Sequence, residues 1–129
     1  PLLVTGMTVT PLDDPPYIVA RSDWYKVYWE DSYLIECFVP EPERIVSYEW
    51  SDGGATAVFP VGTDRISFDD APARIRWTAP RAREEFALTV TVRDSGGNVA
   101  SKTITLYVDT CTCAFPKDGA DLPDEADDE

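Results

Sequence analysis

The side chain that most often carries out acid–base chemistry near neutral pH is missing from this sequence, although it has 24 Asp and Glu residues. Histidine is absent from all 129 residues, which removes the commonest general base near neutral pH and the commonest zinc ligand. Asp69 and Asp70 offer two adjacent carboxylates, but neighbouring residues on a strand point to opposite faces, and a loop at this place has no obvious pocket. We therefore predict that the protein is not an enzyme.

The three cysteines divide into one core position and two positions near the C-terminus. Cys37 lies near the end of its predicted strand, opposite the end where the last strand leads to Cys111. A strand of seven residues spans about 23 Å, whereas the two Cα atoms of a disulfide lie roughly 4.4–6.8 Å apart. Cys37 is thus expected to be a buried thiol unless the tail folds back. Cys111 and Cys113 are disulfide candidates, for a strained local bridge or a link to another chain.

No cofactor is expected, and calcium is the one alternative. Without histidine, Cys-Thr-Cys supplies too few ligands for a metal site. Loop carboxylates could gather around calcium, but their spacing matches no EF-hand loop, and acidic turns are mostly just solvated. The loop aspartates are Asp13, Asp14, Asp31, Asp69, Asp70 and Asp94.

The charge of the chain limits the partners that it can bind. The formal net charge is −13, and residues 117–129 contribute seven acidic residues against one basic residue. An acidic surface repels phosphate backbones, which argues against nucleic acid. No apolar run approaches the roughly 20 residues of a membrane span, so we expect no membrane insertion. The abundance of Thr, Ser, Val and aromatic residues suits an exported β protein, located outside the cell or on a cell or virion surface.

The clearest structural element is a β-hairpin over residues 84–108. Apolar residues alternate with polar ones from Phe86 to Val92, the period of a strand with one buried face. The turn-forming residues 94–98, Asp-Ser-Gly-Gly-Asn, follow, and the alternation resumes up to Val108. Short strands separated by turn signals are also expected over residues 33–39, 45–50, 55–59 and 74–78, with an irregular connection over 60–73. These strands enclose a predicted core that includes Cys37, Trp50, Trp77 and Phe86, with Val46 on the side of Trp50.

The N-terminal third offers candidate contact surfaces. Residues 2–10 form a β-prone run that Pro11 ends; it reads either as an edge strand of the same sandwich or as an arm that pairs with a neighbouring subunit. Residues 24–29, WYKVYW, are apolar on both faces, so some of these rings must be covered by a loop, by the N-terminal segment or by another molecule. The interface candidates are Leu3, Met7, Val9, Trp24, Tyr25, Tyr28 and Trp29.

Several motifs over residues 24–108 resemble those of polycystic-kidney-disease (PKD)-like and immunoglobulin-like modules of exported microbial surface proteins. The motifs are Ile35-Glu36-Cys37, Tyr48-Glu49-Trp50-Ser51, the residues from Ile75 to Pro80, and Phe86 to Val92 with the turn 94–98. The resemblance implies an all-β, antiparallel sandwich of seven or more strands without catalytic character. The predicted organisation is an N-terminal arm and proline linker (1–16), the sandwich (17–110) and an acidic tail containing Cys111 and Cys113 (111–129).

Three functions are compatible with such a module. The first is a structural subunit of an extracellular assembly (filament, surface layer or virion surface), joined to protein partners, among them copies of itself, by β-strand and aromatic contacts. The second is a monomeric spacer or adhesion module of a larger surface protein. The third is a carbohydrate-binding module that uses Trp24, Tyr28 or Trp29.

Overall fold

The computed structural model describes residues 2–12 and 18–109, and most of this chain is extended. Within these ranges it contains ten strands and one turn of 3-10 helix, Pro42–Arg44. No helix in the described ranges has the length and apolar character needed to cross a membrane. The strands are β1 (Gly6–Pro11), β2 (Val19–Arg21), β3 (Trp24–Tyr28), β4 (Ser32–Phe38), β5 (Ile45–Ser51), β6 (Thr56–Val58), β7 (Ile66–Ala71), β8 (Arg74–Thr78), β9 (Glu85–Asp94) and β10 (Val99–Asp109).

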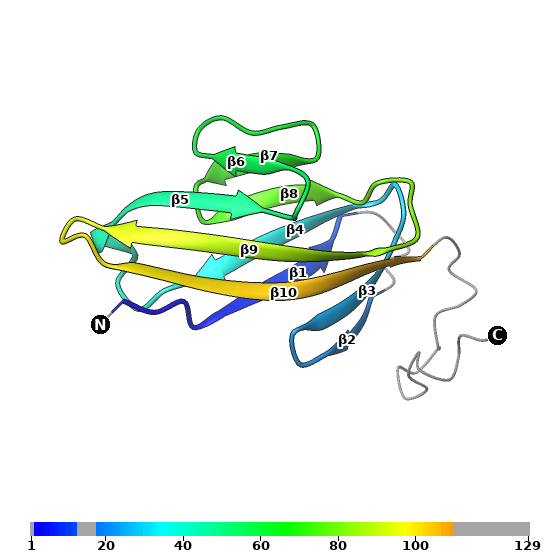
Figure 1. Ribbon diagram of the computed structural model, residues 1–129, viewed down its shortest axis with the longest axis horizontal. Helices are drawn as coiled ribbons and strands as arrows, with labels where there is room; N and C mark the ends of the chain where they lie inside the picture. The colour runs from blue at the N-terminus through cyan, green and yellow to red at the C-terminus, as the bar shows by residue number, and fades with distance from the viewer. Residues whose placement is uncertain (1, 13–17, 110–129) are drawn as a thin grey trace.

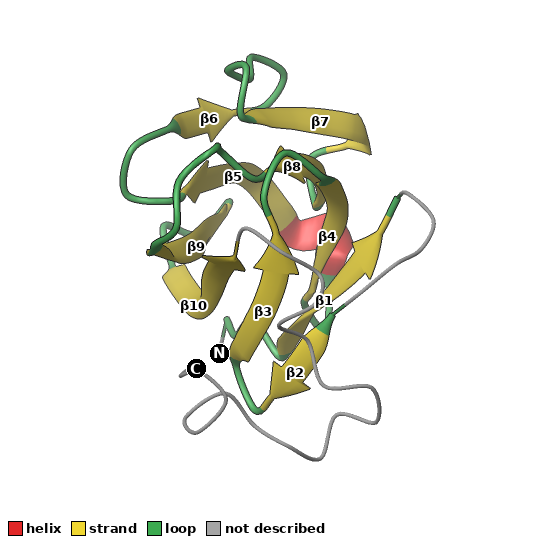
Figure 2. Cartoon of the chain, turned by 90° about the vertical axis from the view of Figure 1, so that its right-hand side faces the viewer, coloured by secondary structure: helices red, strands yellow, loops and turns green. Residues whose placement is uncertain are grey.

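The strands form two sheets that pack face to face. One sheet has the order β1-β4-β8-β7 and the other the order β2-β3-β10-β9-β5-β6. Figure 1 shows β9 and β10 passing in front of β4 and β1, and Figure 2 shows the layers from the side. The first order matches the A-B-E-D sheet of an immunoglobulin domain, and β10-β9-β5-β6 matches its G-F-C-C′ sheet. The predicted all-β sandwich is therefore confirmed, in immunoglobulin-like form.

One strand pair departs from the predicted antiparallel arrangement. β3 runs parallel to β10, with Trp24 opposite Thr105 and Val27 opposite Val108. The chain leaves β3 through Glu30, whose φ is 67°, and continues as β4 in the other sheet. Because no hairpin joins β3 to β10, nothing local imposes antiparallel pairing on them.

The hairpin predicted over residues 84–108 is confirmed as β9 and β10. The two strands pair antiparallel, with Thr89 opposite Thr103. Asp94 closes the turn, since its Oδ1 accepts hydrogen bonds from the backbone N–H groups of Gly96 and Asn98, both at 2.9 Å. Gly97 has a φ of 87°, a conformation that glycine adopts without steric cost.

The dry interior lies between the two sheets and is centred on aromatic side chains. Trp50 from β5 and Trp77 from β8 have no exposed surface, and Phe86 and Cys37 are also buried. The rings of Trp77 and Phe86 meet edge to face, with centroids 5.8 Å apart. Each indole N–H has an acceptor: Trp50 donates to the carbonyl of Pro72 at 3.0 Å, and Trp77 to Asp52 at 2.8 Å. Both large rings are thus buried without an unpaired donor.

The N-terminal run forms an edge strand of the chain's own sandwich. β1 pairs along its whole length with β4, from Gly6 opposite Phe38 to Pro11 opposite Tyr33. Residues 6–11 therefore belong to the four-stranded sheet and do not form a separate arm in this structure. Pairing with β4 turns alternate side chains of the run inward, which buries Met7 in the core.

Two local predictions are wrong. The connection expected over residues 60–73 contains β7, whose register with β8 shifts between Phe68 and Ala71, so its alternation is interrupted. Val46 does not share the buried side of Trp50 and is 64% exposed. A bulge between Ile45 and Ser47 adds one residue to β5, which reverses the side chains that precede it.

Candidate functional site

The outward side chains of β9 and β10 form a surface on the solvent side of the six-stranded sheet, which we call the hairpin face. Only two of its ten side chains are charged, although the whole chain has a net charge of −13. Depletion of charge is the compositional mark of the central part of protein interfaces. The hairpin face comprises Glu85, Ala87, Thr89, Thr91 and Arg93 from β9 and Val99, Ser101, Thr103, Thr105 and Tyr107 from β10.

Hydroxyl groups occupy the middle of the hairpin face. Thr89 and Thr103 lie opposite each other with their hydroxyl oxygens 2.7 Å apart, and the oxygens of Thr91 and Ser101 are 3.2 Å apart. Such cross-strand pairs hold the side chains in fixed rotamers. The middle of the face is therefore neutral and ordered.

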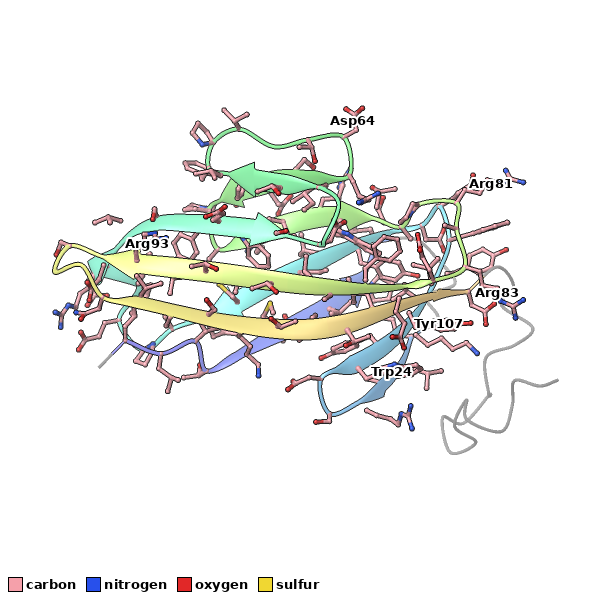
Figure 3. All side chains as sticks on the ribbon, in the orientation of Figure 1. Trp24, Asp64, Arg81, Arg83, Arg93 and Tyr107 are labelled. Carbon is pink, nitrogen blue, oxygen red and sulfur yellow. The ribbon has the colours of Figure 1, made fainter. Side chains whose placement is uncertain are left out.

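An aromatic stack stands at one end of the hairpin face. The ring centroids of Trp24 and Tyr107 are 6.2 Å apart, with their planes 14° from parallel. The Arg21 guanidinium lies 4.5 Å from the Trp24 centroid. Because β3 lies between β2 and β10, Arg21 and Tyr107 approach Trp24 from opposite sides. Figure 3 shows Trp24 and Tyr107 next to each other on β3 and β10.

This stack has consequences for what Trp24 can bind. A sugar ring stacks on an open aromatic face, but the Arg21 guanidinium lies over the Trp24 ring and the Tyr107 ring lies beside it, which reduces the face left for a sugar. The indole N–H points toward Glu85, whose Oε2 lies 3.5 Å away. The stack therefore combines two aromatic rings and a guanidinium, residue types that are enriched at protein contacts.

The other predicted aromatic contacts do not extend this surface. Tyr25 is half-buried and packs against the core. The backbone N–H of Tyr28 donates to the hydroxyl of Tyr33 at 2.9 Å. The Trp29 ring lies beneath Arg81, whose guanidinium is 4.9 Å from the ring centroid. Among the predicted aromatics, only Trp24 contributes to the stack with Tyr107.

The remaining interface candidates come from the N-terminal run, and the structure separates them. Met7 is buried, Val9 is half-buried and Leu3 is 55% exposed. Leu3 borders a surface hollow of about 350 Å³, lined by Leu2, Leu3, Pro40, Glu41, Arg44, Asp94 and Asn98. Its charged groups already have partners, since Arg44 pairs with Glu41 at 3.0 Å and Asp94 holds its own turn. The hollow thus lacks an uncommitted charged group to recognise a ligand.

Asp52 is a buried carboxylate that accepts hydrogen bonds from two side chains and two backbone N–H groups. Arg65 donates to it through Nε at 2.5 Å and Nη2 at 3.0 Å, and Trp77 donates at 2.8 Å. The backbone N–H groups of Gly54 and Ala55 donate to Oδ1 as well. Burial acts to raise the pKa of Asp52, but the hydrogen bonds from Arg65, Trp77 and the backbone outweigh it and lower the pKa to about 2. Asp52 is therefore ionised at neutral pH, and it links the end of β5 to β8.

A second buried charge pair links β3 to β10. The Lys26 ammonium lies 3.2 Å from Asp109 Oδ2, and both side chains are almost completely buried. Arg83 approaches the other oxygen of Asp109 at 3.6 Å. The positions of these groups suit a structural role, since a buried carboxylate needs nearby cations.

The cysteine and metal predictions concern Cys37, the two cysteines near the C-terminus and the aspartates that could bind calcium. Cys37 is a free, buried thiol, and burial raises its pKa to about 12 despite a backbone hydrogen bond that lowers it. Cys111 and Cys113 lie outside the described residues, as do Asp13 and Asp14. Asp69 and Asp70, which were predicted to lie in a loop, are part of β7, and Asp69 accepts hydrogen bonds from Arg74. In the described ranges, no group of three or more His, Cys, Asp or Glu side chains is placed to hold a metal ion.

Sequence reasoning missed Arg21, Glu85, Arg93, Val99 and Tyr107 as functional candidates. Alternation along β9 and β10 places Glu85, Arg93, Val99 and Tyr107 on the solvent side, so their exposure could be predicted from the sequence. The contact between Tyr107 and Trp24 could not be predicted from the sequence, because it depends on the parallel pairing of β3 with β10.

Fold and face together define an immunoglobulin-like β-sandwich domain with an ordered, charge-poor sheet surface. No protein-family model matches the chain. A search of curated proteins also found no match. Among solved structures, the chain is similar to a structure of murine CRIg at 16% sequence identity, over 81% of this chain and 99% of that chain, with a TM-score of 0.44. A similarity at this level says nothing about function.

Proposed function

We propose that this chain is a non-catalytic structural subunit that joins an extracellular assembly, such as a filament, a surface layer or a virion surface, through protein contacts on the hairpin face. The observation that carries this proposal is a sheet surface with a neutral middle that ends in the Arg21–Trp24–Tyr107 stack, on an otherwise acidic chain. Aromatic and arginine side chains anchor protein contacts at low entropic cost. Threonine and serine allow a partner surface to approach closely.

The buried carboxylates support a non-catalytic role. Asp52 is engaged by Arg65, Trp77 and two backbone N–H groups, and Asp94 by the N–H groups of its turn. Asp109 pairs with buried Lys26. Each of these carboxylates stabilises the fold, which leaves none of them poised for proton transfer to a substrate.

The contact surface differs from the one that the sequence suggested. β1 completes the chain's own sheet through its pairing with β4, so the proposed contact does not use an N-terminal arm. The same pairing favours a second candidate function, a monomeric spacer or adhesion module within a larger surface protein, in which the sandwich is complete by itself.

Sedimentation velocity and electron microscopy of the full chain over a range of concentrations test the proposal. Thr89→Arg places a charge in the middle of the hairpin face, and Thr8→Arg makes the same change at an exposed position of β1 in the other sheet. We expect self-association that Thr89→Arg abolishes and Thr8→Arg preserves. Assemblies that Thr89→Arg leaves unchanged would reject the role of the face. A wild-type chain that stays monomeric throughout would favour the spacer.

A further inference from the structure

We infer that the hairpin face pairs with the hairpin face of a second copy of this chain across a two-fold axis, with Arg93 of each copy against Glu85 of the other. The inference rests on the proposed function, because it takes the hairpin face to be a protein contact and names the partner. An isologous contact of this kind uses one surface twice and closes as a dimer.

The sequence positions on the hairpin face are symmetric about its centre. Glu85 and Arg93 each lie four residues from Thr89 on β9, and Tyr107 and Val99 each lie four residues from Thr103 on β10. Thr89 and Thr103 are directly opposite each other. Figure 3 shows Arg93 and Tyr107 toward opposite ends of the hairpin. Consider a two-fold axis that lies in the contact plane, perpendicular to the strands, and passes over this threonine pair. Rotation about this axis reverses the direction of the strands. Each end of one hairpin therefore lies on the opposite end of the hairpin in the second copy.

The two ends of the face are complementary in charge. Arg93 is exposed and forms no salt bridge with any residue in the described part of the chain, whereas Glu85 at the other end is an exposed carboxylate. The register places Arg93 opposite Val99 and Glu85 opposite Tyr107, so each end has one charged and one apolar side chain. In the two-fold arrangement every cation meets an anion. A two-fold axis along the strands would instead place Glu85 on Tyr107 and Arg93 on Val99, so neither charge would meet an opposite charge.

The apolar members of the two ends are complementary as well. Val99 is 49% exposed, although it is aliphatic. In the two-fold arrangement the Tyr107 ring of the second copy lies over Val99. Trp24 packs against Tyr107 in the single chain, so the ring is held in place before the contact forms. Such preorganisation reduces the entropy that binding must overcome.

The hairpin face, together with the outward sides of the adjacent strands β3 and β5, is large enough for a specific contact. A ten-residue strand is about 33 Å long, and four neighbouring strands, β3, β10, β9 and β5, span roughly 15–19 Å with their side chains. Because β3 and β5 are shorter than the hairpin strands, two such surfaces bury about 1,000 Å² in total, which is the lower limit for a specific interface. Aligned sheets pack within about 30° of each other, and the long Arg93 side chain can follow that tilt.

Charge reversal in the full chain tests the inference, with Kd measured by sedimentation equilibrium up to about 1 mM. In a homodimer of Arg93→Glu, two pairs of carboxylates face each other, and in a homodimer of Glu85→Arg, two pairs of guanidinium groups do. We expect each single variant to raise Kd about tenfold or more. An equimolar mixture of the two variants forms a heterodimer in which both contacts join opposite charges. Native mass spectrometry should therefore show a heterodimer that outcompetes both homodimers.

Arg76→Glu is the matched control, because Arg76 is an exposed arginine on β8 in the other sheet. Its Kd should stay close to that of the wild type. The inference is overturned if the wild type is monomeric at every concentration, if the single variants dimerise like the wild type, or if their mixture shows no preference for the heterodimer. Assemblies that are disrupted by Thr89→Arg but insensitive to both charge reversals would reject the two-fold pairing while leaving the proposed function intact.

Discussion

At the scale of single residues, Asp52 is the side chain on which the core depends most. Asp52→Ala removes the acceptor for the buried Trp77 N–H and the partner of Arg65. We expect the free energy of unfolding to fall by about 3 kcal/mol, measured by urea denaturation. Asp69→Ala is the control, since the Asp69 carboxylate is 37% exposed and pairs with Arg74, so its loss should cost less than about 1 kcal/mol. Equal losses in the two variants would show that Asp52 has no special role.

The lowered pKa of Asp52 also predicts a pH dependence. In the unfolded chain the carboxyl takes up its proton near the ordinary value of 3.8, whereas in the folded protein it does so near 2. The stabilisation by the anion is therefore complete above about pH 5 and is lost as the pH falls through 4 toward 2. We expect the difference in unfolding free energy between the wild type and Asp52→Ala to shrink over this interval. A difference that stays constant down to pH 2 would contradict this prediction.

At the scale of elements, β3 is the strand whose placement creates the aromatic stack. The buried pair of Lys26 and Asp109 joins β3 to β10. Lys26→Ala therefore leaves the buried Asp109 carboxylate without its nearest cation. We expect a loss of about 2–3 kcal/mol in the free energy of unfolding, together with faster amide hydrogen exchange in β2 and β3. Lys102→Ala breaks a more exposed pair with Asp23 and should cost less than about 1 kcal/mol. Unchanged exchange in β2 and β3 of the Lys26 variant would mean that other contacts hold these strands.

The elements also show which predictions local patterns can support. The hairpin of β9 and β10 was predictable because alternation and the turn residues 94–98 are both local signals. β7 was not, since the register shift near Asp70, whose φ is 70°, interrupts its alternation. The partner of β3 was not predictable either, because alternation identifies the buried face of a strand but says nothing about which strand lies beside it.

At the scale of the whole molecule, the net charge of −13 opposes any pairing of two copies. This repulsion acts over many ångströms and is screened by salt, whereas the contacts between Arg93 and Glu85 are short and less affected. We expect Kd of the wild-type dimer to decrease severalfold as sodium chloride rises from about 20 to about 150 mM. Sedimentation equilibrium at several salt concentrations measures this. A dimer that weakens steadily with salt would mean that the local ion pairs outweigh the overall repulsion.

The sequence alone determined the all-β class, the buried positions of Trp50, Trp77, Phe86 and Cys37, and the hairpin, because side chains alternate with a period of two wherever one face of a strand is dry. The tertiary structure determined which side chains come together on the surface of the molecule. It placed β1 in the chain's own sheet and brought β3 alongside β10, so that Trp24 stacks on Tyr107. Contacts between strands far apart in sequence depend on how the two sheets assemble. A local sequence pattern does not indicate which strands will lie side by side.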